Sequence, residues 1–181
     1  MSRDIRVQRS CQALGDALMA ALADGEGLEV TISALCARAG VSRPTFYQHF
    51  DSVEDLLAAA MRRRLDDLDA TAGSFAEVLR SLARDRATYG AHLDDVRILP
   101  TVALTLTEWA MERIRAQHPG LDPAAVEFAA AGATRLLIGW LRQPVRDAEE
   151  TAELIRTLAS RTLGIDEADL TMPAAGPPAR V

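Results

Sequence analysis

Apolar side chains recur every three or four residues along most of this chain, which is the spacing of amphipathic α-helices. Glycine and proline interrupt the pattern at regular places. Runs of β-branched and aromatic residues that would favour strands are scarce, whereas Ala, Leu, Arg and Glu are abundant. The pattern therefore predicts an all-α protein. The expected helices span approximately residues 3–24, 31–39, 43–50, 52–72, a segment from 75 to 89, a short helix or loop at 93–99, and then 101–117, 123–142 and 148–163.

Two of these expected helices are short and are separated by a tight turn. Thr31 can cap the first of them, because its side-chain oxygen can accept a backbone N–H of the first turn. Gly40 suits the left-handed residue that ends a helix. Ser42 can cap the next helix, and Pro44 is tolerated in its first turn. Two short helices around a glycine turn indicate a helix-turn-helix, which places its second helix in the major groove of DNA.

The second of these helices, expected over 43–50, divides into an inner and an outer side. Phe46 and Phe50 are four residues apart and should face inward. The remaining side chains carry donors suited to DNA, since Arg binds guanine or phosphate and hydroxyl and imidazole groups donate to phosphate. A lone Tyr or His on a helix is more often a packing residue, but the complete set favours DNA contact. These outward residues are Arg43, Thr45, Tyr47 and His49.

The segment also resembles the DNA-binding domain of the TetR/AcrR family of bacterial regulators, over roughly the first 60 residues. The resemblance rests on an ordered string: Thr31, Ala39-Gly40-Val41-Ser42-Arg43, Thr45-Phe46-Tyr47, His49-Phe50, Glu54 and Leu56-Leu57. It implies that Arg43, Thr45, Tyr47 and His49 touch DNA. Thr31 and Ser42 join them as candidate contacts, with Thr31 near the DNA backbone. The chain departs from the family at Val53, where the family often has a Lys that holds a phosphate.

The resemblance further implies nine helices, three for DNA and six for a body that pairs with a second subunit. The paired helices would be those at about 123–142 and 148–163, forming a four-helix bundle between subunits. A twofold dimer reads two half-sites of a palindromic operator, whereas a monomer reads one. The candidate interface residues are Val126, Leu136, Trp140, Leu154 and Leu158. Which apolar face is core and which is interface stays open at this point.

A small-molecule pocket among the middle helices is also implied by the resemblance, and ligand binding there would release DNA. The candidate lining residues are Leu82, Arg86, Tyr89, Thr105, Glu108 and Trp109. Each of them also fits an ordinary core position. Arg86 and Glu108 stand out because a charged residue on an apolar helix face needs a partner. They could pair with each other or face solvent, and the sequence does not name the ligand.

The charge distribution restricts the nucleic-acid hypothesis to the N-terminal part of the chain. The 181 residues have a net charge of −6, and all twenty basic residues are Arg. Residues 1–50 are neutral, with five Arg and five acidic residues, so the remainder holds the whole negative charge. Specific binding requires local rather than global positive charge. The run Arg62-Arg63-Arg64 is expected to be a solvated face or a set of ion-pair partners.

The sequence offers little support for catalysis, metal binding or membrane insertion. Cys11 and Cys36 lie on apolar faces and are expected to be buried, and the three His residues lack the spacing of metal ligands. We find no nucleophile with a neighbouring base, no glycine-rich phosphate loop and no cofactor motif. No apolar run of membrane-spanning length is apparent and no signal peptide is seen, so a cytoplasmic protein is expected.

These observations predict a homodimeric DNA-binding regulator, expected to be a repressor released by an unknown small molecule. The expected domains are residues 1–50 for DNA, residues 51–170 for ligand binding and dimerisation, and a disordered tail at 171–181. The helix at about 52–72 would link the two domains. The alternative is a helical co-regulator that acts mainly through a protein partner, which the absence of Lys at Val53 and the neutral N-terminal part favour.

Overall fold

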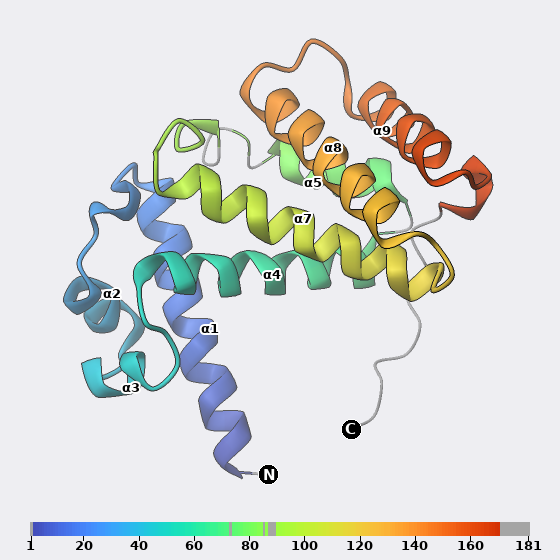
Figure 1. The fold of residues 1–181 in the computed structure, drawn as a ribbon. Coiled ribbons are helices and arrows are strands. Elements are labelled where there is room, and N and C mark those ends of the chain that lie inside the picture. The colour runs from blue at the N-terminus through green and yellow to red at the C-terminus, as the bar shows by residue number, and fades with distance from the viewer. Residues whose placement is uncertain (1, 73, 85, 87–89, 171–181) are drawn as a thin grey trace.

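The computed structural model describes the chain except for residues 1, 73, 85, 87–89 and 171–181 (Figure 1). Both the expected tail and Tyr89 therefore lie outside the described residues. Within the described part, the secondary structure consists of eight α-helices and two short 3₁₀ turns, without a strand. The expectation of an all-α fold is confirmed. The elements are α1 (Ser2–Ala23), η1 (Gly27–Glu29), α2 (Ile32–Ala39), α3 (Arg43–Tyr47), α4 (Val53–Thr71), α5 (Phe75–Arg84), α7 (Ile98–Gln117), α8 (Pro123–Arg142), α9 (Ala148–Leu163) and η2 (Glu167–Asp169).

Helices α1, α2 and α3 form the N-terminal unit, which we call the head. Its capping groups are those that the sequence predicts. The Thr31 side chain accepts a hydrogen bond from Ala34 N, and the Ser42 side chain accepts one from Thr45 N. Gly40 adopts φ +64°, and the Val41 amide after it donates to the Cys36 carbonyl at 3.0 Å. The helix-turn-helix is therefore fixed by local chemistry on both sides of the turn.

Helix α4 connects the head to the remaining helices, which we call the body. It begins with the Ser52 side chain accepting a hydrogen bond from Asp55 N, while Asp55 Oδ2 accepts one from the backbone N–H of Asp51. It packs against α1 and then against α7, so that it lies across the middle of the molecule (Figure 1). Its apolar face is buried along most of its length, at Leu56, Leu57 and Leu65.

The body is a layered arrangement of α5, α7, α8 and α9 around α4. Helix α8 packs between α7 and α9, and α9 covers α5. Asp122 caps α8, and Asp147 forms a capping box with Glu150 at the start of α9, both as predicted. Helix α7 begins at Ile98, three residues earlier than expected. Pro100 is tolerated in that first turn because its missing N–H has no intrahelical partner there, and Asp95 Oδ1 accepts the amides of Arg97 and Ile98.

Helix α8 corrects the expectation that no apolar run reaches membrane-spanning length. Among the described helices, it is the one long and apolar enough, by length and composition alone, to cross a membrane. In its most apolar window, 44% of the residues are buried inside the protein, and a core helix passes the same test. The sequence reading missed this run because Ala and Gly dilute its large apolar residues. Its other face carries apolar side chains at the protein surface, at Phe128 and Leu136.

The left-handed backbone of Gly40 generates the first prediction. We expect Gly40→Ala to lower the free energy of unfolding by about 1–2 kcal/mol, because a Cβ is strained at positive φ. No atom lies within 4 Å of a Cβ placed there, so crowding contributes nothing. Gly40→Asn is the matched variant and should cost less, since Asn tolerates this conformation. Urea denaturation measures both, and equal losses for the two variants would contradict this account of the turn.

Candidate nucleic-acid interface

Two phenylalanines hold α3 against the head and thereby decide which of its side chains are presented outward. Phe46 is 0% exposed, and Phe50 is also buried. Tyr47 is 50% exposed, and its ring meets that of Phe46 edge-on at a centroid distance of 5.4 Å. This contact fixes the direction of the Tyr47 ring while its hydroxyl stays at the surface. Arg43 is exposed, and Thr45 and His49 are half-buried.

Helix α3 is shorter than predicted, since it ends at Tyr47 rather than Phe50. The chain then continues as a hydrogen-bonded turn in which the amides of His49 and Phe50 both donate to the Phe46 carbonyl at 2.9 Å. The helix must end here because Ser52 takes an extended conformation in order to cap α4. His49 is therefore held by a turn rather than by a full helix.

The capping hydroxyls keep donors that can serve a second partner. The Thr31 oxygen accepts the Ala34 amide at 3.2 Å, which leaves its hydroxyl hydrogen for another acceptor. The hydroxyls of Ser42 and Thr45 bond to each other at 2.8 Å. Only one hydrogen is consumed in that contact, so the pair retains one donor. Thr31, Ser42 and Thr45 can each shape the head and still contribute to phosphate binding.

Val53 occupies the first position of α4 and is buried. Its side chain packs in the head core, where the expected family pattern would often place a Lys at the surface. This position therefore supplies apolar packing and no positive charge. A second basic residue of the head, Arg38, is paired with Glu26 at 2.7 Å. The exposed guanidinium of Arg43 is accordingly the main cationic group on α3.

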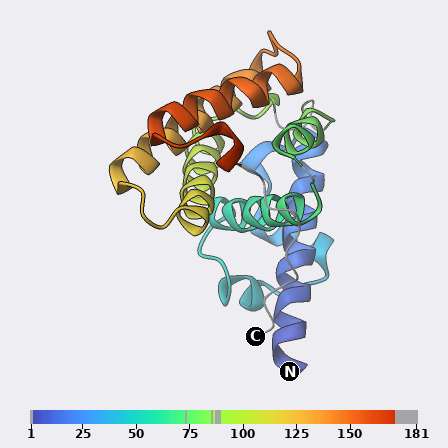
Figure 2. The same cartoon turned by 90° about the vertical axis from the view of Figure 1, so that its right-hand side faces the viewer.

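The surface formed by α3 lies at the same end of the molecule as the N-terminus of α1 (Figures 1 and 2). Arg9, on α1, is exposed. Arginines near a recognition helix can add phosphate contacts, which are independent of base sequence. The arrangement is a small head with an exposed polar helix and two hydroxyl caps. Such a surface can bind a nucleic-acid groove.

The sequence comparison agrees with this geometry. Residues 18–60 match the family model described as "Bacterial regulatory proteins, tetR family". The N-terminal part of this chain therefore contains a tetR-family DNA-binding domain. The matched span runs from the middle of α1 through α2 and α3 into α4, and so contains the whole helix-turn-helix. The search of curated proteins found no match to the chain.

The body contains a cavity of about 70 Å³. Of the predicted pocket residues that the structure describes, Leu82 is the one that lines it. Arg86 donates from Nε to the Leu141 carbonyl at 3.0 Å, and Trp109 donates from Nε1 to Asp66 Oδ1 at 3.0 Å. Arg86 and Glu108 therefore do not pair with each other.

Thr105 and Glu108 do not line this cavity either. Thr105 is buried and Glu108 is exposed, and Tyr89 lies outside the described residues. Helical periodicity identifies the faces of α7 but not which face borders a void. Two lining residues that the sequence reading missed are Met19 and His92. Met19 lies within residues 1–50, which were expected to form the DNA-binding domain, and His92 precedes α7 in a segment without periodicity.

The predicted interface residues divide between the core and the surface. Val126 and Trp140 are buried inside the chain, and Trp140 donates from Nε1 to the Arg146 carbonyl at 2.8 Å. The prediction that these two side chains form a dimer interface is corrected, because they pack inside the chain's own core. Leu154 is half-buried, whereas Leu136 is 37% and Leu158 is 42% exposed.

Phe128, which the sequence reading did not single out, is 72% exposed and lies two helical turns before Leu136 on the same face of α8. Figure 2 shows that α8 and α9 lie away from the head. We call the exposed apolar residues Phe128, Leu136 and Leu158 the outer face.

One charge cluster joins head and body and generates a pH prediction. Backbone amide bonding at the α4 N-terminus, followed by the hydrogen bond from Arg97, holds the pKa of Glu54 below its usual range. A lowered carboxyl pKa stabilises the folded state above the ordinary value, about 4.3 for Glu, and that stabilisation is lost as the pH falls through the lowered value. We therefore expect Glu54→Gln to reduce the dependence of stability on pH below about 4.3.

Urea denaturation at a series of acidic pH values checks this expectation. Burial raises the pKa of Asp69 despite its ion pair with Arg113, so this carboxyl changes the stability with pH in the opposite direction to Glu54. The contribution of Glu54 is therefore read from the difference in unfolding free energy between the variant and the wild type. Asp67→Asn, at an exposed position on α4, is the matched control. If the unfolding free energy of Glu54→Gln changed with pH in parallel with that of the wild type, the Arg97 contact would not stabilise the ionised Glu54 carboxylate.

Proposed function

We propose that this protein is a tetR-family regulator, namely a cytoplasmic homodimeric repressor that binds a palindromic operator and is released by a small-molecule effector. The observation that carries the DNA part of the proposal is the presentation of Arg43 and Tyr47 by a helix whose inner side is locked by Phe46. Arg43, Thr45, Tyr47 and His49 make the contacts, with Thr31 and Ser42 on the DNA backbone. Residues 1–50 form the reading head, and α4 connects it to the body.

The outer face supports the dimeric part of the proposal. Phe128 and Leu136 are large apolar side chains left at the surface of α8, and Leu158 is another on the neighbouring helix α9. Exposed apolar side chains on neighbouring helices are typical of association sites. A second copy of the chain suits it, because the same patch meets itself across a twofold axis. Two heads held by one interface then read two half-sites at a fixed spacing.

The cavity in the body supports release by an effector. It lies between helices that include α4, the connection to the head, and α8, which carries the outer face. A ligand that favours a different arrangement of these helices changes the separation of the two heads. Binding of effector and operator are then linked, and each lowers the affinity for the other by the same factor.

The DNA contacts are tested by substitution on α3. We expect Arg43→Ala and Tyr47→Ala each to weaken binding to the cognate site by about 1–3 kcal/mol. The measurement is fluorescence anisotropy with DNA flanking the gene, at two salt concentrations and with competitor DNA. Arg84→Ala removes an exposed Arg from α5, far from the head, and should leave affinity unchanged. Unchanged affinity for both α3 variants would reject α3 as the recognition helix.

The same measurement separates the proposal from the co-regulator alternative, which the buried Val53 favours. A repressor binds its site tightly in the presence of competitor DNA, and its affinity falls steeply with salt. A co-regulator gives weak binding that disappears at the higher salt concentration and co-purifies with a protein partner.

The dimer is tested on the outer face. We expect Phe128→Asp to raise the dimer dissociation constant by about 30-fold or more, since burying an unpaired charge at an apolar contact costs at least about 2 kcal/mol. Analytical ultracentrifugation measures this, and circular dichroism confirms that the helices persist. Val145→Asp is the matched control, because Val145 is also exposed but lies between α8 and α9. A Phe128→Asp protein that remains dimeric would place the interface elsewhere.

A further inference from the structure

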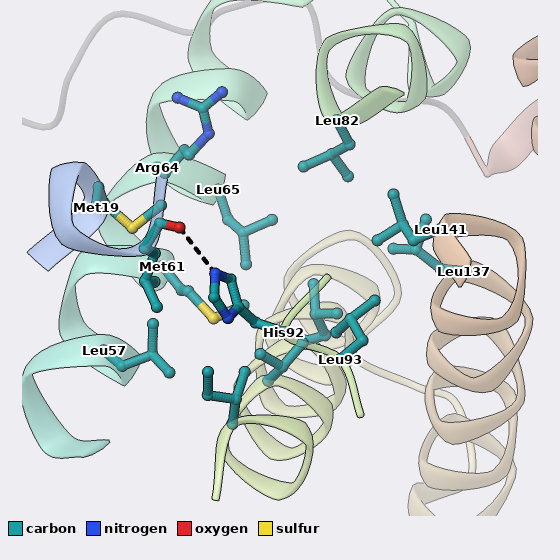
Figure 3. A pocket seen from close by; sticks show the side chains of 14 residues that line it. Met19, Leu57, Met61, Arg64, Leu65, Leu82, His92, Leu93, Leu137 and Leu141 are labelled. Carbon is teal, nitrogen blue, oxygen red and sulfur yellow. Dashed lines mark hydrogen bonds between the residues drawn. The ribbon is translucent and has the colours of Figure 1, made fainter. Parts of the chain in front are cut away.

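The cavity in the body borders the head directly. Figure 3 shows that its walls come from several elements, with Met19 on α1, Leu57 and Met61 on α4, and His92 and Leu93 before α7. Helix α1 belongs to the reading head, so a molecule in this cavity would touch the head itself. The cavity therefore lies at the joint between head and body.

The chemistry of the walls restricts what the cavity can bind. Its lining surface is almost entirely carbon and sulfur, with Arg64 and His92 as the two lining residues that carry polar side-chain groups. The Arg64 guanidinium points away from His92 and the leucines in Figure 3. His92 Nε2 is already hydrogen-bonded to the Leu22 carbonyl at 2.8 Å. A charged or strongly polar ligand would lose its hydration here without compensation.

The size of the cavity requires its walls to move when a ligand binds. A volume of about 70 Å³ is well below the roughly 300–1,000 Å³ of ordinary ligand pockets. Met19 and Met61 line the side nearest the head (Figure 3). Methionine side chains are unbranched and adapt readily to a new shape. Expansion is therefore easiest on the side where α1 and α4 meet the cavity.

Hydrogen bonds connect the head and the body on the side of the cavity that α1 and α4 form. His92 bonds to the Leu22 carbonyl of α1, and Arg97 Nη2 donates to the Leu28 carbonyl of the head at 3.0 Å. Arg97 Nε also donates to Glu54 at the start of α4, at 2.7 Å. His92 itself lines the cavity, and Arg97 is next to Ile98, which also lines it. An outward shift of the cavity wall would lengthen these contacts.

We propose that the cavity binds a compact, uncharged, mainly hydrocarbon molecule, which acts as a wedge between α1 and the segment 92–98. This inference rests on the proposed function, in that the wedge is the step that reduces operator binding. The ligand enlarges the cavity and breaks the His92 bond to Leu22. The head then loses its fixed orientation relative to the body, and the spacing of two heads no longer matches the operator.

Butylbenzene is a suitable probe, with phenylbutyrate as its charged partner of similar shape. We expect butylbenzene to raise the melting temperature, because it binds the folded state, and phenylbutyrate to leave it unchanged. Butylbenzene should also weaken operator binding by about tenfold, within the usual range of allosteric coupling. Equal thermal shifts with both compounds, or none with butylbenzene, would overturn the ligand class.

Leu137→Phe tests the position of the site. Leu137 lines the cavity from α8, and the larger ring should fill it and abolish the thermal shift with butylbenzene. Leu163→Phe makes the same change in a separate buried cluster and should retain the shift. Val102→Leu fills the cavity by a smaller amount and replaces Leu137→Phe if that protein does not fold. A full thermal shift in the filled variants would place the ligand elsewhere.

Hydrogen exchange tests the wedge separately from binding. We expect butylbenzene to speed amide exchange in residues 18–30, and His92→Phe, which keeps a ring but removes the bond to Leu22, to speed it without ligand. Butylbenzene that binds but leaves both exchange and operator affinity unchanged would overturn the wedge. A protein that shows no operator binding even without butylbenzene would instead contradict the proposed function, while the thermal shifts still decide the ligand class.

Discussion

The structure depends on one helix, α4, being packed into two units at once. Its first turns are buried against α1, and its later turns pack along α7. Polar pairs fix the register of that second contact: Arg62 with Glu112, Trp109 with Asp66 and Arg113 with Asp69. Polar pairs that are partly exposed contribute little net stability, but these three pairs can form together only in this register. A helix restrained in this way transmits a shift at one end to the other with little loss.

The head and the body share one buried apolar cluster, and polar contacts also cross the joint between them. Leu14, Leu18 and Phe46 of the head belong to the same cluster as Val102 and Leu141 of the body. Between the units, Arg63 pairs with Asp16 at 2.9 Å, and Arg97 reaches Leu28 and Glu54. Ion pairs and single hydrogen bonds at a partly exposed joint are individually weak. The joint is accordingly the place where modest binding energy can change the arrangement of the molecule.

Charge and apolar surface are distributed so that the two ends of the molecule have different partners. The head is neutral overall and exposes Arg43, whereas the rest of the chain carries the negative charge. An acidic body is repelled by DNA, so the head is the part that approaches it. Three of the exposed large apolar side chains, Phe128, Leu136 and Leu158, lie on α8 and α9, away from the head. DNA reading and self-association are thus separated in space.

The sequence by itself determined the elements whose causes are local. The caps at Thr31, Ser42 and Asp147 and the left-handed Gly40 depend on residues within a turn of each other, and the bounds of α8 and α9 are as expected. The exposed side of α3 also followed from the spacing of Phe46 and Phe50.

Tertiary structure alone decided which apolar faces meet each other. It buried Val126 and Trp140, left Phe128 outside and brought His92 against Leu22, 70 positions away. Helical periodicity records that a face is apolar but not what covers it, since burial depends on packing between segments far apart in the chain.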